Sequence, residues 1–309
     1  MRAKLKIYPN NIESELDLPG YSFEAVSNIK NGVAILIPGA IYADENGKNT
    51  DFTKFANHPI LYDFNTLKEL KKLDVESNGI FPFRVTDATN VDEKGFFWLL
   101  SQNHCTLSSN ICFSDPQRFL CLIKAKYDAD LSKISFVSKF VIPIADPNTN
   151  LVSCNTVVNI APNTFLIFPY ILLNIGVMLV TIKDRVATYR TITLTSNGKP
   201  LTPEEYNAMK ISSACNIPDG ILIVKQNAKD FMYKIKFRSL YNLLYNEAKS
   251  LPIYRSRVKI TGNQPAPPVN ASYSGIEALT LDECNRIIGL SEWKTDVLAF
   301  ARPVRGILY

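Results

Sequence analysis

The sequence is poor in the residues on which much metal and acid–base chemistry depends. Its 309 residues include two His, two Trp, four Met and six Cys. With His58 and His104 as the only imidazoles, the chain has little material for a His-ligated metal site or a His-based catalytic triad. No CxxC pair occurs, and no Cys lies at zinc-ligand spacing from either His. We therefore predict no metal and no cofactor.

Long apolar runs and a strong charge imbalance are also missing. The 34 Lys and Arg against 29 Asp and Glu leave a net charge of +5, too small to predict a nucleic-acid partner without a local basic cluster. The longest apolar stretch, Thr164 to Val180, is interrupted by a proline and is shorter than the roughly 20 residues that span a bilayer. The N-terminus has no signal-peptide pattern. We expect a soluble protein, cytoplasmic or part of an assembled particle, with no membrane insertion.

A Gly-rich phosphate loop and a G-x-S-x-G motif are absent as well, which disfavours nucleotide and serine-nucleophile chemistry. Four of the six Cys fall inside apolar, strand-like runs, where they read as small buried hydrophobes. This cysteine usage fits a reducing compartment.

What the sequence does contain is a repeat. Each copy consists of a short strand, Asn and a β-branched residue, a turn, and an apolar strand. The Asn position is occupied by Asn28, Asn90, Asn159 and Asn216 in four copies, and by Thr280 in a fifth, degraded copy. Their spacings are 62, 69, 57 and 64 residues, and going from 280 through the C-terminus back to 28 adds 57 more. A period that closes around the chain indicates a ring. We interpret the repeated Asn as side chains that bond nearby backbone and fix each turn.

Each repeat also has a second half made of a strand, a tight turn and a strand. Four short strands per unit are typical of propeller blades, which hide their two apolar faces by stacking in a closed circle. We predict an all-β fold, a five-bladed β-propeller forming one domain over 1–309. Its predicted blades are approximately 20–78, 79–148, 149–200, 208–262, and 274–309 together with 1–18.

The last blade lacks a fourth strand, so we expect the N-terminal strand, Ala3 to Tyr8 or Glu15 to Leu18, to close the ring. A sixth blade hidden in the long second unit is the alternative. Thr202-Pro203-Glu204-Glu205 predicts a capped helix that ends at Met209. The helical spacing of Leu240, Leu243, Leu244, Ala248 and Leu251 predicts a second helix, with strands around Tyr245-Asn246 as its alternative.

Long connections gather on one face of the predicted ring, where the innermost strands begin. Loops on a rigid scaffold commonly carry binding, so we place the candidate site on this face. Candidate polar residues at the strand starts are Glu24, Arg84, Asp87, Asn155, Ser212, Ser213 and Glu277, and candidate aromatic anchors in the loops are Tyr42, Phe52, Phe55 and Tyr273.

The repeat layout over the whole chain resembles the five-bladed propellers of arabinanase- and invertase-like glycosidases, and equally the sugar-binding tachylectin type. For a hydrolase, the resemblance implies that Glu24, Asp87 and Glu277 converge as acid and base. Those glycosidases carry an Asp on the first blade and an acidic residue on the next two, whereas here Glu24 and Asn155 take the first and third positions. We predict a non-catalytic scaffold that presents its long loops to a protein partner or a larger assembly. The alternative is a glycoside hydrolase or a glycan-binding lectin that binds carbohydrate at the channel mouth.

Overall fold

In the computed structural model of the chain, the described residues form six β-sheets and two short helices. This all-β architecture confirms the predicted class. The described residues are 4–7, 14–17, 23–39, 41, 57–66, 68–82, 84–102, 120–143, 154–169, 176–225, 232–256, 272–282, 286–294 and 299–307.

Four of the sheets have at least four strands, and each begins with its innermost strand. The first sheet holds β3 (Phe23–Lys30), β4 (Val33–Pro38), β5 (Ile60–Asp63) and β6 (Lys68–Lys72). The second holds β8 (Arg84–Ala88), β9 (Phe96–Gln102), β10 (Leu120–Asp128), β11 (Lys133–Ile142) and β7 (Asp74–Glu76). The third holds β12 (Cys154–Ala161), β13 (Thr164–Pro169), β14 (Val177–Lys183), β15 (Val186–Ser196), β16 (Lys199–Pro200) and β20 (Ser250–Pro252). The fourth holds β17 (Ile211–Ile217), β18 (Gly220–Lys225), β19 (Met232–Lys236) and β21 (Tyr254–Ser256).

The fifth sheet has three strands, β22 (Ser272–Leu281), β23 (Arg286–Lys294) and β24 (Ala299–Ile307), and we call it and the four above the five large sheets. The sixth sheet is the hairpin of β1 (Lys4–Ile7) and β2 (Ser14–Asp17). The second repeat unit, which the alternative divided into two blades, forms a single sheet in its described residues.

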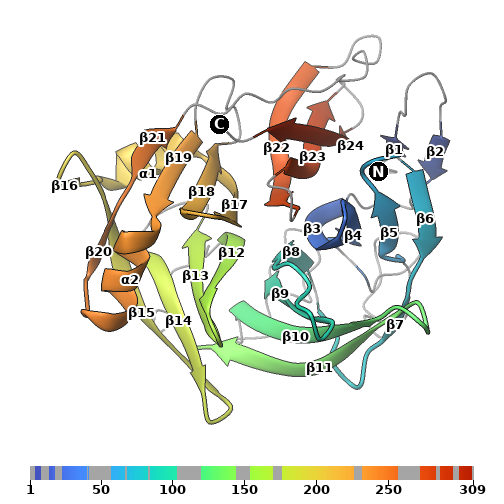
Figure 1. Cartoon of the computed structure of the whole chain (residues 1–309), viewed down its shortest axis with the longest axis horizontal. Coiled ribbons are helices and arrows are strands. Elements are labelled where there is room, and N and C mark those ends of the chain that lie inside the picture. The colour runs from blue at the N-terminus through green and yellow to red at the C-terminus, as the bar shows by residue number, and fades with distance from the viewer. Residues whose placement is uncertain are drawn as a thin grey trace, which may run out of the picture.

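The sheets are arranged in a propeller-like ring (Figure 1). The first strand of each large sheet contacts the first strand of the next, in the order β3, β8, β12, β17, β22 and back to β3. Strands that cross between sheets reinforce the outer edge. β7 follows the first sheet in sequence but pairs in parallel with β11 of the second, and β20 leaves the fourth sheet to pair in parallel with β15 of the third. β1 lies against β24 (Figure 1).

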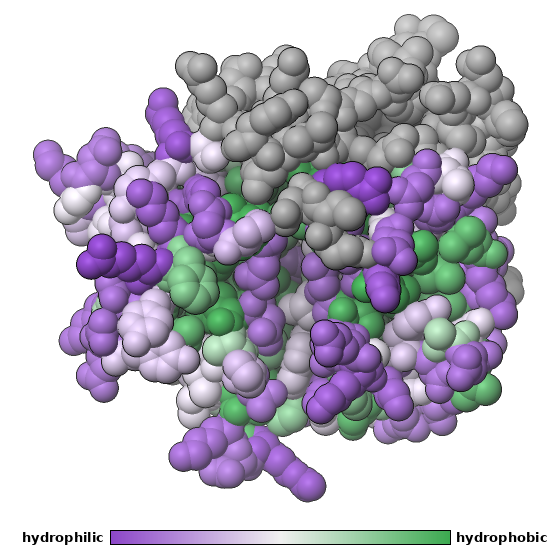
Figure 2. Space-filling model, viewed as in Figure 1, coloured by the Kyte–Doolittle hydropathy of each residue, from purple (hydrophilic) through white to green (hydrophobic). Residues whose placement is uncertain are grey.

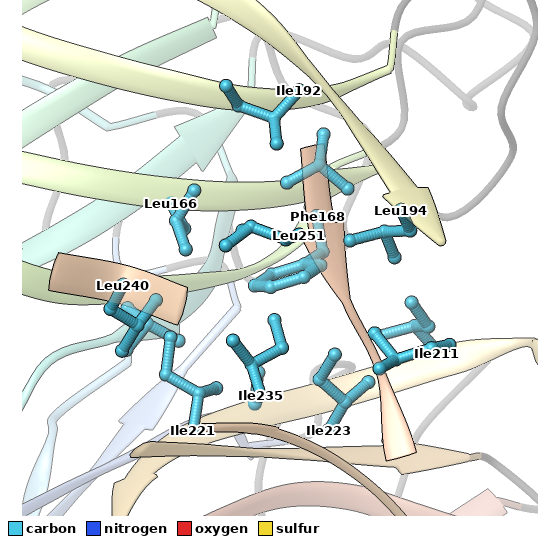
Figure 3. Close-up of a cluster of buried hydrophobic side chains, with 14 of the residues drawn as sticks. Leu166, Phe168, Ile192, Leu194, Ile211, Ile221, Ile223, Ile235, Leu240 and Leu251 are labelled. Carbon is cyan, nitrogen blue, oxygen red and sulfur yellow. The ribbon is translucent and has the colours of Figure 1, made fainter. Parts of the chain in front are cut away.

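The hydrophobic core lies between neighbouring sheets. Between the third and fourth sheets, Phe168, Ile192, Ile223 and Leu240 belong to one buried cluster (Figure 3). β13 is buried at all six of its positions because sheets cover both of its faces, whereas the outer strand β15 alternates between buried and exposed. Each fully buried Leu, Ile or Phe contributes about 1.5 to 3 kcal/mol, so this stacking stabilises the ring.

Both predicted helices are present. α1 (Pro203–Met209) begins with the predicted capping box, in which Thr202 Oγ1 accepts the N–H of Glu205 and the Glu205 carboxylate accepts the N–H of Thr202. α2 (Phe237–Tyr245) follows β19 directly, so the helical alternative for this segment is confirmed. Neither helix of the described part of the chain could span a membrane. Purple, hydrophilic residues dominate the described surface on the side shown, with small green patches between them (Figure 2).

Candidate functional site

A β-bulge marks the same place in the first strand of all five large sheets. The bulged residues are Glu24, Thr86, Asn155, Ser212 and Glu277. Bulges change the direction of a side chain and increase local twist. Four predicted site residues, Glu24, Asn155, Ser212 and Glu277, therefore occupy equivalent backbone positions on four different sheets.

In three of the five sheets, the residue after the bulge joins one sheet to the next. The Thr156 hydroxyl accepts the N–H of Ala214 at 2.8 Å, and the Ser213 hydroxyl accepts the N–H of Leu279 at 3.0 Å. Both hydroxyls are buried, as are the backbone groups they contact. Two sheets carry Ala25 and Ala278 at the position after the bulge, where the side chain has no polar atom to make this bond.

Asp87 occupies this position in the second sheet and is only 5% exposed. Its Oδ2 accepts the Thr156 hydroxyl at 2.5 Å and the N–H of Val157 at 2.8 Å, and its Oδ1 accepts the N–H of Ala88 at 2.8 Å. Burial raises the pKa of the Asp87 carboxyl from 3.8 to about 7, against the opposing effect of these three hydrogen bonds. The structure thus places Asp87 between two sheets rather than on an open channel wall.

Glu24 lies beside the backbone of its own sheet. Its carboxyl carbon is 2.7 Å from the point where a side chain on Gly39 would begin, so a larger residue at position 39 would require the Glu24 side chain to move. The carbonyl of Gly39 accepts the N–H of Val85 at 2.7 Å, which links the first sheet to the second.

The other predicted site residues are placed less fully. Arg84, Asn155, Tyr273 and Glu277 lie within β8, β12 and β22, but their side chains are outside the described part. Tyr42, Phe52 and Phe55 lie outside the described residues altogether.

A cavity of about 720 Å³ opens at the opposite end of the ring, where the first strands end. It is lined by residues of β8, β12, β17 and β22 and by the turns that follow the first three of these strands. Asn90, Asn159 and Asn216 contribute the amides of its wall, and Phe237 of α2 forms part of its rim. The site predicted from the sequence lies on the other face, and this cavity was missed. The three repeated Asn residues that line the cavity were the feature of the sequence that could have indicated it.

Two amides of this wall, those of Asn90 and Asn216, bond to other sheets instead of fixing their own turns, which corrects the interpretation from sequence for these two residues. Oδ1 of Asn90 accepts the N–H of Asn28 at 3.1 Å and the hydroxyl of Thr280 at 2.6 Å. The side-chain amide of Asn216 donates to the carbonyl of Asn159 at 2.8 Å. The amides therefore tie the ring together at this end.

Aromatic rings and a cation lie on one side of the cavity. The Lys124 ammonium is 4.5 Å from the centre of the Phe96 ring, within cation–π distance. Trp98 is buried against Phe165 in an edge-on arrangement with ring centres 4.9 Å apart. Lys124, Phe96 and Trp98 all line the cavity, which accordingly combines amide, aromatic and ammonium groups.

α2 carries an exposed row of aromatic side chains that begins at the cavity rim. Phe237, Tyr241 and Tyr245 are four residues apart and are 63%, 50% and 67% exposed. We call these three residues the α2 aromatic ridge. The signal in the sequence is the spacing of the aromatic residues within FRSLYNLLY, which was interpreted only through its buried leucines.

The α2 aromatic ridge is held rigidly. Leu240 and Leu243 are buried in the core between the third and fourth sheets. The Arg190 guanidinium on β15 donates to the carbonyls of Leu243 and Ala248, each at 2.9 Å. These contacts fix the last turn of the helix to the third sheet.

The described residues contain no group of three or more His, Cys, Asp or Glu that could hold a metal ion. What the site offers is an apolar and hydrogen-bonding surface on a rigid frame. Its sheets define the chain as an all-β protein with a propeller-like ring.

No protein-family model and no curated protein matches the chain. Among solved structures, the allergen Mala s 1 of Malassezia sympodialis is similar with 6% identity over 94% of each chain and a TM-score of 0.48. A putative glycoside hydrolase from Parabacteroides distasonis has 11% identity over 99% of this chain and 92% of its own, with a TM-score of 0.44. U3-55K has 7% identity over 99% of this chain and 98% of its own, with a TM-score of 0.40. At such low identities and scores, none of them carries an argument about function.

Proposed function

We propose that this chain is a five-bladed propeller that acts as a non-catalytic scaffold for a macromolecular partner. Support for five blades comes from the five equivalent bulges and from the circle of contacts among the first strands. β1 beside β24 supports closure of the last, three-stranded sheet by the N-terminal segment. In this proposal the long connections form one binding face, and the cavity with the α2 aromatic ridge forms another.

One observation carries the non-catalytic assignment: the buried Asp87 carboxyl serves to join two sheets. A glycoside hydrolase needs two accessible carboxyl groups on either side of the scissile bond. Asp87 accepts three hydrogen bonds at almost no exposure, so approaching substrate would have to displace Thr156 and Val157. The geometry therefore favours binding over hydrolysis.

Two measurements test this proposal. The purified chain should hydrolyse a panel of aryl glycosides no faster than its Glu24→Gln and Asp87→Asn variants do. A turnover that both substitutions abolish would establish the hydrolase instead.

The second measurement concerns the partner. Cross-linking in an extract of the native source should yield a macromolecule that forms a complex of fixed stoichiometry with the purified chain in native mass spectrometry. A chain that stays alone in the extract and after mixing with every cross-linked candidate would overturn the scaffold.

A further inference from the structure

We infer that the α2 aromatic ridge is a docking surface for an acidic, apolar segment of a partner protein. This inference rests on the proposed scaffold function and assigns its partner a chemistry. It starts from the two faces of α2. Leu240 and Leu243 already supply the contacts that hold the helix in the core, so the exposed rings of the ridge have no part in that packing.

A surface that contacts only solvent seldom carries three exposed aromatic side chains in a row. Aromatic side chains bury about 150 to 250 Å² each and are enriched at the centres of protein interfaces. At their observed exposures the three ridge side chains offer about 270 to 450 Å², roughly a third to a half of the 800 Å² or so that one partner buries in a standard interface. Phe237 also borders the cavity, so a segment on the ridge would extend over this cavity.

The ridge is ordered before any partner arrives. The rings of Tyr241 and Tyr245 contact each other with centres 4.7 Å apart, and the Arg190 guanidinium holds the end of the helix. Binding to such a surface loses little side-chain entropy.

Charge decides the kind of partner. Lys236 and Arg238 flank Phe237 and are both exposed, and the Lys236 ammonium lies 4.5 Å from the centre of the Tyr254 ring. Lys249 adds a third exposed cation beyond the other end of the ridge. Two exposed acids lie near the ridge, Glu247 and Asp219, and the Asp219 carboxylate is already paired with the Lys234 ammonium. This excess of positive charge is complementary to acidic side chains.

A nucleic acid fits this surface less well. Single strands are bound by a basic groove that follows the backbone alongside stacked bases, whereas the cations here cluster mainly at one end of α2. We therefore commit to a protein segment that alternates acidic and apolar residues.

The test uses the whole chain and three fluorescent probes of about 12 units: an alternating Glu/Leu/Phe peptide, the same peptide with Lys for every Glu, and oligo-dT. Fluorescence anisotropy should show that the acidic peptide binds the native chain more tightly than the other two probes. Tyr241→Ala and Arg238→Glu should each weaken binding by about tenfold. Leu131→Ala, which removes an equally exposed apolar side chain on the second sheet, should leave it unchanged.

Three results would overturn the inference: equal affinity for the acidic and the Lys peptide, tighter binding of oligo-dT, or acidic-peptide binding that Tyr241→Ala does not change. Equal melting temperatures of the variants and the native chain confirm that they are folded. A cross-linked partner that still binds Tyr241→Ala would refute the ridge while leaving the scaffold function intact.

Discussion

Replacing Asp87 by Asn should remove a large pH dependence from the stability of the ring. The native carboxyl has a pKa of about 7 because it is buried, against 3.8 for the same group in the unfolded chain. Between these values the folded chain holds a proton that the unfolded chain has released, so the free energy of unfolding falls as pH rises. Each pKa unit corresponds to about 1.4 kcal/mol, so the full decrease is about 4 kcal/mol.

The Asn variant carries no proton to release, and its amide oxygen can still accept the hydrogen bonds from Thr156 and Val157. Its –NH₂ group takes the place of the oxygen that accepts the N–H of Ala88, which costs about 1 to 3 kcal/mol at every pH. As the pH rises from about 4.5 to about 8.5, the free energy of unfolding of the variant should increase by about 3 kcal/mol relative to that of the native chain.

Denaturant unfolding of both proteins across this pH range measures that difference. Asp130→Asn, at an exposed carboxyl in the turn between β10 and β11, is the control and should track the native chain at every pH. If the stability curves of Asp87→Asn and the native chain run parallel, the reasoning about the buried carboxyl is wrong.

Other positions give further expected outcomes. Thr156→Val should cost about 1 to 3 kcal/mol in chemical denaturation because the buried N–H of Ala214 loses its acceptor. Gly220→Ala should cost more than about 3 kcal/mol, since its φ is +150° and a methyl group there would overlap the carbonyl of Ile235. Burial raises the thiol pKa of Cys121 to about 11 and of Cys215 to about 12, so mass spectrometry should find both unmodified by iodoacetamide near pH 8 until the chain unfolds. Deleting residues 1–18 should lower the melting temperature if β1 closes the ring.

Matched control substitutions show whether these losses of stability are specific to the sites named. Thr188→Val removes an exposed hydroxyl and should change stability by less than about 0.5 kcal/mol. Gly198→Asn, at φ +77° with open space around it, should be tolerated because Asn adopts left-handed backbone readily. Losses equal to those of Thr156→Val or Gly220→Ala would contradict the explanations given for those sites.

Much of the fold was predictable because its determinants are local. The alternation of apolar residues predicted the strands, and the repeated phrase predicted units whose sheets now stand in a ring. The helix from Pro203 was predicted to the residue, since Thr202 and Glu205 cap it within a single turn. α2 was predicted as well, although it stops at Tyr245, because its buried leucines have helical spacing.

The site depended on distant contacts that no local pattern contains. The sequence by itself determined that Asp87 lies in an inner strand, but its partner Thr156 is 69 residues away on the next sheet. Only the stacking of the sheets decided that this carboxyl is buried, that the amides of Asn90 and Asn216 join neighbouring strands, and that α2 turns its aromatic residues outward. A strand or helix follows from its neighbours in sequence, whereas burial, pKa and exposure follow from whichever segment the ring brings alongside it.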